Sequence, residues 1–295
     1  MSDRIVITGG GGQVGHALAG ESARQGRDAL ALTHSQWDIT DPGAAERIVK
    51  RGDVVFNCAA YTNVDAAESD AIRAEAVNNL GAGHVAAACA RAGARLIHIS
   101  TDYVFSGVFE GGGPHPYEPS DPTGPLSVYG RTKLAGERAV LAALPEAQVV
   151  RTSWVYTGTG SDFVATMRRL AAGDGPVSVV ADQVGSPTYV ADLAAALLQL
   201  ADHPVRAPVV HAANQGAASR FEQARAVFEG VGADPQRVLP VSTADMPRPA
   251  HRPRYSALSG AQWAAAGLTP LRPWRDALTE ALAAAGRPGP LPSTP

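Results

Sequence analysis

Residues 127–137, SVYGRTKLAGE, contain a tyrosine and a lysine four positions apart, Tyr129 and Lys133. On a helix, residues at i and i+4 are neighbours, so the phenol and the ammonium would lie one turn from each other. A phenol has an ordinary pKa of about 10, which makes it a reluctant proton donor, and a nearby cation lowers that pKa. The pair is therefore a candidate for a general acid with the cation that tunes it. Taken alone it is far more typical of an ordinary helix surface, because such a spacing arises by chance in many chains of this length, so its interpretation depends on the rest of the chain.

A run of four glycines, in the stretch IVITGGGGQVGHAL, follows a strand pattern and precedes a helical one. Gly9, Gly12 and Gly15 match the spacing Gly-x-x-Gly-x-x-Gly, and Gly10 with Gly12 and Gly15 matches Gly-x-Gly-x-x-Gly. Such spacing suits a tight turn, a close approach of the backbone to a pyrophosphate, and close packing of the helix on the strand. The free N–H groups at the helix N-terminus would bind the phosphates. The cluster predicts a dinucleotide site, with a plain glycine-rich turn as the alternative.

The expected second strand ends in ALALTHSQWD, with Thr33 and His34 where an NAD site would have an acidic residue for the ribose 2′-hydroxyl. Without that carboxylate the extra phosphate of NADP meets no repulsion, and His34 or Ser35 could donate hydrogen bonds to it. We therefore expect NADPH, with NADH as the alternative. Asp38, followed by Ile39, is in position for the adenine or, equally, for a turn before Pro42.

Composition excludes several classes of protein. The chain has 295 residues, a formal net charge of −3 and scattered basic residues, which argues against a nucleic-acid or acidic-membrane partner. Its two cysteines, Cys58 and Cys89, have neither disulfide-framework nor zinc-ligand spacing. No apolar stretch is long enough to cross a membrane, and no leader pattern precedes the first strand. We expect a cytoplasmic protein.

Short β-branched runs alternate with alanine-rich helical patterns in the first half of the chain. Strands are expected at residues 4–8, 28–32, 54–57, 95–99 and 148–151, and helices at 13–25, 42–50, 70–92 and 128–144. The alternation predicts an α/β fold, a Rossmann-type doubly wound parallel sheet that binds its ligand at the carboxyl ends of the strands.

The second half is looser and richer in proline, as expected of a smaller C-terminal substrate-binding α/β lobe. Helices are expected at 163–172, 191–201, 219–229, 259–266 and 274–285, and strands at 177–180 and 208–212. We predict a cofactor domain at 1–152, to which residues 182–212 return, a substrate lobe at 153–285 and a disordered tail at 286–295. The proline-rich loop at 104–127 is unusually long and leaves a central strand where it could cover a ligand.

Several further stretches occur in a characteristic order: DIT at 38–40, NCAAYTNVDAAES at 57–69, an asparagine at 78, STDYVFSG at 100–107, RTSWVY at 151–156 and DQVGSPTYVADLA at 182–194. Together with the glycine cluster and SVYGRTKLAGE, they resemble the extended short-chain dehydrogenase/reductase family. The resemblance is greatest to its dTDP-4-dehydrorhamnose reductase subfamily and covers residues 4–258. A later stretch, RPAHRPRYSALS, matches that subfamily more loosely.

The resemblance implies that Thr101, Tyr129 and Lys133 are catalytic. NADPH would reduce the C4 carbonyl of a dTDP-4-keto-6-deoxy-L-hexose, Tyr129 would protonate its oxygen, and Lys133 would also hold the nicotinamide ribose. The implied cofactor contacts are Gly9, Gly12, Gln13, Val14, Gly15, Thr33, His34, Asp38, Ile39, Ala59, Ala60, Tyr61, Thr62, Ile99, Tyr129 and Lys133. The implied sugar-nucleotide contacts are Thr101, Asp102, Trp154 and Arg252. Thr101 could instead cap a turn, and Trp154 could instead be a core aromatic.

The chain also departs from the family pattern. Some members hold magnesium at a subunit interface through acidic residues, and the corresponding positions here are Ala17 and Ala191. We expect no metal, and a homodimer, if one forms, that is not bridged by one. Other readings stay open: a 4-ketoreductase for another nucleotide deoxysugar, or a non-catalytic subunit like the regulatory subunit of methionine adenosyltransferase, which resembles the same family. A related epimerase with tightly held NAD is disfavoured, because no acidic residue ends the second strand.

Overall fold

The computed structural model describes residues 4–109 and 113–286. Its centre is a six-stranded sheet in the order β10-β5-β4-β3-β1-β2, in which every pair is parallel. The strands are β1 (Ile5–Thr8), β2 (Ala29–Leu32), β3 (Val54–Asn57), β4 (Arg95–Thr101), β5 (Gln148–Thr152) and β10 (Val209–His211). The predicted doubly wound parallel sheet is confirmed.

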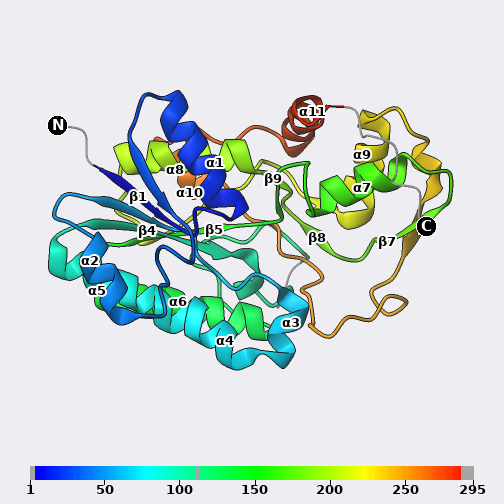
Figure 1. Ribbon diagram of the computed structural model, residues 1–295. Helices are drawn as coiled ribbons and strands as arrows, with labels where there is room; N and C mark the ends of the chain where they lie inside the picture. The colour runs from blue at the N-terminus through cyan, green and yellow to red at the C-terminus, as the bar shows by residue number, and fades with distance from the viewer. Residues whose placement is uncertain (1–3, 110–112, 287–295) are drawn as a thin grey trace.

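Helices cover both faces of the sheet (Figure 1). On one face lie α1 (Gln13–Arg24), α8 (Val190–Asp202) and α10 (Ala261–Ala265), with α1 packed on α8. On the other lie α2 (Pro42–Ile48), α5 (Ala82–Ala92) and α6 (Val128–Ala143), with α5 packed on both of its neighbours.

Successive residues of a strand pack alternately into two hydrophobic cores, one on each face of the sheet. In β1, Ile5 and Ile7 pack with Leu197 and the α1/α8 layer, while Val6 packs with Val85 and the α2/α5 layer. Successive side chains of a strand point to opposite faces, so strands covered on both sides read as nearly continuous apolar runs. The sequence pattern located the sheet strands for this reason.

The helical stretch expected at 70–92 is not one regular helix. It divides into α4 (Ala71–Glu75), a π-helical segment η1 (Ala76–Gly81) and α5. A preceding helix, α3 (Val64–Ser69), was not predicted. π-Helical turns arise where a helix makes room for a local contact and are frequent at functional sites.

The second lobe lies to one side of the sheet (Figure 1). It contains α7 (Phe163–Ala171), α9 (Arg220–Gly230), α11 (Trp274–Ala284) and the parallel pair of β7 (Val177–Val180) and β12 (Val238–Val241). The short pairs β6 (Val155–Tyr156) with β9 (Thr188–Tyr189), and β8 (Val184–Gly185) with β11 (Ala218–Ser219), complete it. The sequence predicted the three helices and β7 but not β12 or the two-residue strands. Of the predicted disordered tail, residues 287–295 lie outside the described residues.

The long loop after β4 is bound to the chain near residue 258. The Tyr117 N–H donates to the Ala257 carbonyl at 2.8 Å, the Tyr117 carbonyl accepts from Ser259 N at 2.8 Å, and its ring stacks on Phe105. No loop residue between 103 and 128 that the structure describes lines the large cavity discussed below. Within the described ranges, no helix is both long and apolar enough to span a membrane.

Candidate active site

A large cavity of about 1100 Å³ runs along the carboxyl edge of the sheet. The strand order reverses at β1, whose neighbours β2 and β3 lead in opposite directions, and such a switch point is where doubly wound sheets bind ligands. The cavity is lined by the glycine turn, the ends of β3 and β4, the start of α6, residues 152–156, residues 161–163 and Arg220. It therefore spans from the sheet to the second lobe.

The glycine turn closes one end of the cavity. Gly9 has φ of 62°, and a Cβ atom there would lie 2.8 Å from the Ala59 backbone. Gly12 precedes α1 without a side-chain cap, so the first N–H groups of that helix are left for a ligand. Gly9, Gly12, Gln13 and Val14 line the cavity, whereas Gly15 does not and instead packs against the Gly9 carbonyl.

The end of β2 lies beside this turn. His34, Asp38 and Ile39 line the cavity, but Thr33 does not, and its hydroxyl lies 3.0 Å from that of Ser35. Asp38 accepts hydrogen bonds from the N–H and hydroxyl of Thr40, and these outweigh burial and hold its pKa below the ordinary value. It thus forms the local turn that was one of its two predicted roles, and it still faces the cavity.

The segment after β3, residues 59–62, lines the cavity with all four of its predicted residues, Ala59, Ala60, Tyr61 and Thr62. Asn78, in the π-helical segment, fixes this wall. Its Oδ1 accepts from Tyr61 N at 2.8 Å, and its Nδ2 donates to the Tyr61 carbonyl and to Thr132 Oγ1, both at 3.1 Å. The sequence marked Asn78 only as part of a family pattern.

Thr101, Tyr129 and Lys133 all line the cavity, and Ile99 lines it with them. Thr101 is the last residue of β4, and Tyr129 lies in the first turn of α6, which Ser127 caps by accepting from Gly130 N. Lys133 is 2 % exposed, and its Nζ donates to the Ile99 carbonyl at 2.7 Å. Thr101 Oγ1 also accepts from Tyr103 N at 3.2 Å, so it caps a turn as well as facing the cavity.

Burial dominates the electrostatics of the triad. It raises the pKa of Tyr129 well above the ordinary value; the Thr101 side chain opposes this, while Asp102 and Tyr103 add to it. The net shift of the Tyr129 pKa is therefore upward, opposite to the lowering that was expected from Lys133, because burial is the largest cause. Burial lowers the pKa of Lys133 itself to about 8, against the opposing effects of Glu137 and Cys58.

Asp102 and Trp154 line another part of the cavity wall. Asp102 accepts from Ser256 Oγ at 2.6 Å, and burial raises its pKa to about 6 despite this hydrogen bond and those of Ser153 and Thr101. Trp154 has φ of 46°, and no other non-glycine residue that the structure describes has positive φ. Its indole lies against Gly185, where a Cβ atom would be 2.5 Å from the ring.

Arg220 is a lining residue that sequence reasoning missed, because an arginine at the start of a lobe helix matches no motif. Its guanidinium carbon lies 3.5 Å from the centre of the Trp154 ring. Among the described residues no carboxylate pairs directly with it, and burial lowers its pKa to about 10. A desolvated cation without an ion-pair partner favours an anionic or electron-rich ligand.

Arg252 is not brought to the cavity wall. Its two terminal nitrogens donate to the two carboxylate oxygens of Asp65, at 3.0 and 2.9 Å. This bidentate pair already engages the guanidinium, so the predicted contact of Arg252 with the sugar nucleotide requires an exchange of partners.

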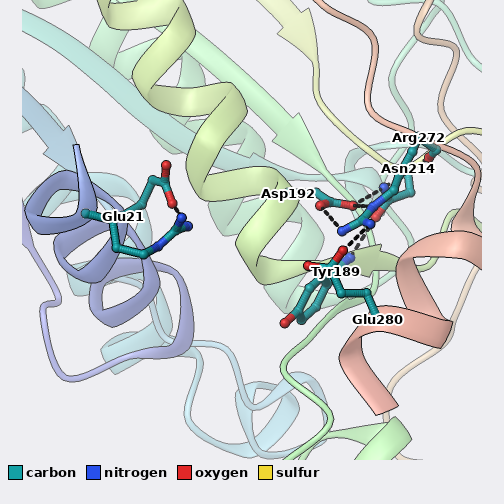
Figure 2. Close-up of polar contacts among 7 residues, drawn as sticks. Glu21, Tyr189, Asp192, Asn214, Arg272 and Glu280 are labelled. Carbon is teal, nitrogen blue, oxygen red and sulfur yellow. Dashed lines mark hydrogen bonds and ion pairs between the residues drawn. The ribbon is translucent and has the colours of Figure 1, made fainter. Parts of the chain in front are cut away.

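Ala17 and Ala191 are half-buried and pack into the apolar clusters between the helices. The acidic groups near them are occupied by arginines: Figure 2 shows Asp192 enclosed by Arg272 and Asn214, with Glu280 close by. Arg272 pairs with both Asp192 and Glu280, and Glu21 pairs with Arg24. The absence of a metal at this place stays a prediction.

The sequence model described as the RmlD substrate binding domain matches residues 3–286. The chain belongs to this family. Within the family, it is 70% identical over 284 residues to the dTDP-4-dehydrorhamnose reductase of Mycobacterium tuberculosis, an alignment that covers 96% of this chain and 93% of that protein. The predicted family membership is confirmed.

Two solved members of the RmlD family share the fold along nearly their whole length. The dTDP-4-dehydrorhamnose reductase of Clostridium acetobutylicum superposes with a TM-score of 0.89 at 36% identity, covering 96% of this chain and 99% of that one. The reductase of Bacillus anthracis, solved in complex with NADP, gives a TM-score of 0.88 at 37% identity, covering 95% and 98%.

Proposed function

We propose that this RmlD-family chain is an NADPH-dependent reductase that converts dTDP-4-dehydrorhamnose to dTDP-L-rhamnose. The observation that carries the proposal is the convergence of Thr101, Tyr129 and Lys133 in one cavity with the glycine turn. The names of its relatives supply the substrate: they are dTDP-4-dehydrorhamnose reductases over nearly the whole chain. Fold alone would not separate this activity from others of the same architecture.

The residues at the sheet end of the cavity fit a phosphorylated dinucleotide. The N–H groups at the start of α1 and the turn at Gly9 suit the pyrophosphate, and Thr33 and His34 stand where an NAD site has its acidic residue at the end of β2. The next carboxylate along the chain, Asp38, lies 3.8 Å from His34 Nδ1 and accepts hydrogen bonds from Thr40. A cavity of about 1100 Å³ exceeds an ordinary single-ligand pocket, so it has room for cofactor and sugar nucleotide together. When bound, NADPH supplies the hydride.

Tyr129 is the proton donor in this proposal. Its raised pKa keeps the phenol protonated at neutral pH, as the reduction of a carbonyl requires. Charge that develops on the carbonyl oxygen is met by the phenol proton, with the Thr101 hydroxyl beside it. Lys133 brings a positive charge to the same edge and holds the cofactor ribose, and its position is set by the Ile99 carbonyl.

The two parts of the chain divide the work in this proposal. Residues 1–152 bind the cofactor and residues 153–285 shape the sugar end through Trp154 and Arg220, which stack on each other. Asp102 faces the sugar from the sheet side. Arg252 would bind the diphosphate only by leaving Asp65. A cytoplasmic location and an oligomer without bridging metal stay predictions.

The test is the loss of reduced-nicotinamide absorbance with purified protein and dTDP-4-keto-6-deoxy-L-hexose, run with NADPH and NADH in parallel. We expect faster oxidation of NADPH and formation of dTDP-L-rhamnose, identified by NMR. Tyr129→Phe should retain NADPH binding and lose ~10²–10⁴-fold in kcat, because the general acid is removed. NADPH binding without oxidation would contradict the proposed function and favour another keto sugar or a non-catalytic role.

A further inference from the structure

Three buried polar residues form a row across the sheet beneath Lys133. Thr8 of β1 pairs in register with Asn57 of β3, and Asn57 pairs with His98 of β4. All three side chains are 0% exposed, and they point to the face that α6 covers, where Lys133 enters. Fully buried polar side chains are almost always hydrogen-bonded, so each donor and acceptor in this row should have a partner.

The hydrogen-bond directions along this row follow from one fixed donor. The Ala59 N–H, in the cofactor-lining segment, donates to Thr8 Oγ1 at 3.1 Å. The Thr8 hydroxyl therefore has its own proton free for Asn57 Oδ1, at 2.7 Å. With its oxygen engaged, Asn57 turns Nδ2 to His98 Nδ1, 3.1 Å away, and that nitrogen must accept.

A histidine that accepts at Nδ1 and is neutral carries its proton on Nε2. The pKa of His98 lies well below the ordinary value because the ring is buried and Lys133 is close, so the imidazole is neutral. Its Nε2 lies 3.5 Å from Lys133 Nζ, at the long limit for a hydrogen bond, and with its proton on Nε2 the imidazole can donate to the neutral amine but not to the ammonium.

The opposite arrangement leaves a proton without a partner. If Nε2 accepted from the lysine, Nδ1–H would donate to Asn57, and the amide would turn its NH₂ group to Thr8. Thr8 Oγ1 would then receive two donors, from Asn57 and Ala59, and its hydroxyl proton would have no acceptor among the described residues. At full burial that loss is costly.

We propose that His98 is a positioning residue for Lys133: held by Thr8 and Asn57, it turns Nε2–H toward the amine, directs it to the Ile99 carbonyl and the cavity, and disfavours its protonation. The other groups that face the lysine are the Cys58 thiol and the carboxylate of Glu137, which is itself paired with Arg151. Through Ala59, the row also joins the lysine to the wall of the cofactor site. The inference deepens the proposed function, but its main test does not depend on turnover.

The composition makes that test direct, because the chain has two lysines, Lys50 and Lys133. In protein labelled with ¹³C at lysine Cε, an NMR titration yields two resonances, and the exposed Lys50 serves as an internal reference. We expect the wild-type Lys133 resonance to titrate well below the ordinary lysine value of about 10.4. Long-range ¹⁵N correlation on histidine-labelled protein should show His98 protonated at Nε2.

The variant His98→Asn keeps an acceptor for Asn57 and removes the N–H that faces the amine. The Lys133 midpoint should rise by roughly one pH unit. His211→Asn is the matched control, because His211 is a buried strand histidine of the same sheet whose side chain makes no hydrogen bond to this row. It should leave the Lys133 midpoint in place.

A fall or no change of the Lys133 midpoint in His98→Asn, or an Nδ1–H imidazole in the wild type, would overturn the proposal. If the protein reduces the sugar, the alkaline limb of kcat/KM for NADPH should move upward with the Lys133 midpoint. If it does not, the proposed function fails while the NMR result still decides the role of His98.

Discussion

Burial shifts the pKa values of Tyr129 and Lys133 in opposite directions: it raises that of the phenol and lowers that of the ammonium. Burial favours the neutral form of each group, so the phenol keeps its proton and the ammonium loses its own more readily. A raised pKa of Tyr129 suits a reductase, because the phenol must be protonated when the carbonyl is reduced. The lysine then limits the pH range of the enzyme.

The pH dependence follows from that limit. The ammonium of Lys133 is present below its pKa of about 8 and is lost as the pH rises through it, whereas Tyr129 stays protonated. We expect kcat/KM for NADPH to fall about tenfold per pH unit above this value. Initial rates of NADPH oxidation at saturating sugar across the alkaline range measure it. A profile that stays level to about pH 10 would show that Lys133 is not the titrating group.

Arg220 should act on the sugar nucleotide and not on the cofactor. Arg220→Ala removes a desolvated cation and the group stacked on Trp154, so we expect the KM for the sugar to rise ~10-fold or more. The KM for NADPH should hardly change. Arg220→Lys keeps the charge but loses the planar stack and should be intermediate.

A matched control exists for this stacking arrangement. Arg275 stacks on Trp274 outside the cavity, at 4.6 Å, and Arg275→Ala should leave both KM values unchanged. Equal KM values in wild type and Arg220→Ala would remove Arg220 from the sugar site.

At the scale of elements, the site depends on how α6 is joined to the sheet. Glu137, one turn beyond Lys133, forms a buried bidentate pair with Arg151 of β5, at 2.9 and 2.8 Å, and accepts from Ser100 of β4. Arg151 also donates to the Pro119 carbonyl of the long loop. The Glu137–Arg151 pair and its hydrogen bonds thus connect α6, two central strands and the loop after β4.

Removal of one partner of this pair should be costly, because it leaves a buried charge without compensation. For Glu137→Ala we expect the free energy of unfolding to fall by about 3–5 kcal/mol, measured by urea denaturation. Glu46→Ala breaks an exposed pair with Arg91 and should cost about 0–1 kcal/mol. Similar losses in the two variants would mean that the Glu137 pair contributes no more than a surface one.

At the scale of the whole molecule, the helices on both faces of the sheet bury two histidines of its strands. His98 and His211 are 0% and 2% exposed, and burial lowers the pKa of both, that of His211 to about 3. In the unfolded chain each regains an ordinary value of about 6.5. The unfolded state therefore binds more protons at mildly acidic pH.

Stability should fall on acidification for this reason. Each histidine contributes a loss of roughly 1.4 kcal/mol per pH unit below about pH 6.5, and for His211 this continues to about pH 3. Urea unfolding at about pH 7 and about pH 5 measures the slope. His211→Asn should reduce the slope, and His115→Asn, at an exposed position, should not. An unchanged slope in His211→Asn would assign the acid sensitivity to other groups.

The sequence by itself determined the fold class and the family, and it singled out the glycine turn and the pair Tyr129 and Lys133, which line the cavity. Each of these depends on local order: apolar runs covered on both faces mark the strands, and the spacing of Gly9, Gly12 and Gly15 or of Tyr129 and Lys133 is set within one element or one turn. Such patterns can be read from the sequence alone. The short strands of the second lobe do not, because two residues carry too little periodicity to be detected.

Only the tertiary structure decided what surrounds these residues. It joined Arg220 to Trp154, paired Arg252 with Asp65, and aligned Thr8, Asn57 and His98 beneath Lys133. It also reversed the expected effect on Tyr129, because the pKa of a buried group depends on how much water the whole fold excludes. These contacts join residues far apart in the chain, and no spacing in the sequence encodes them.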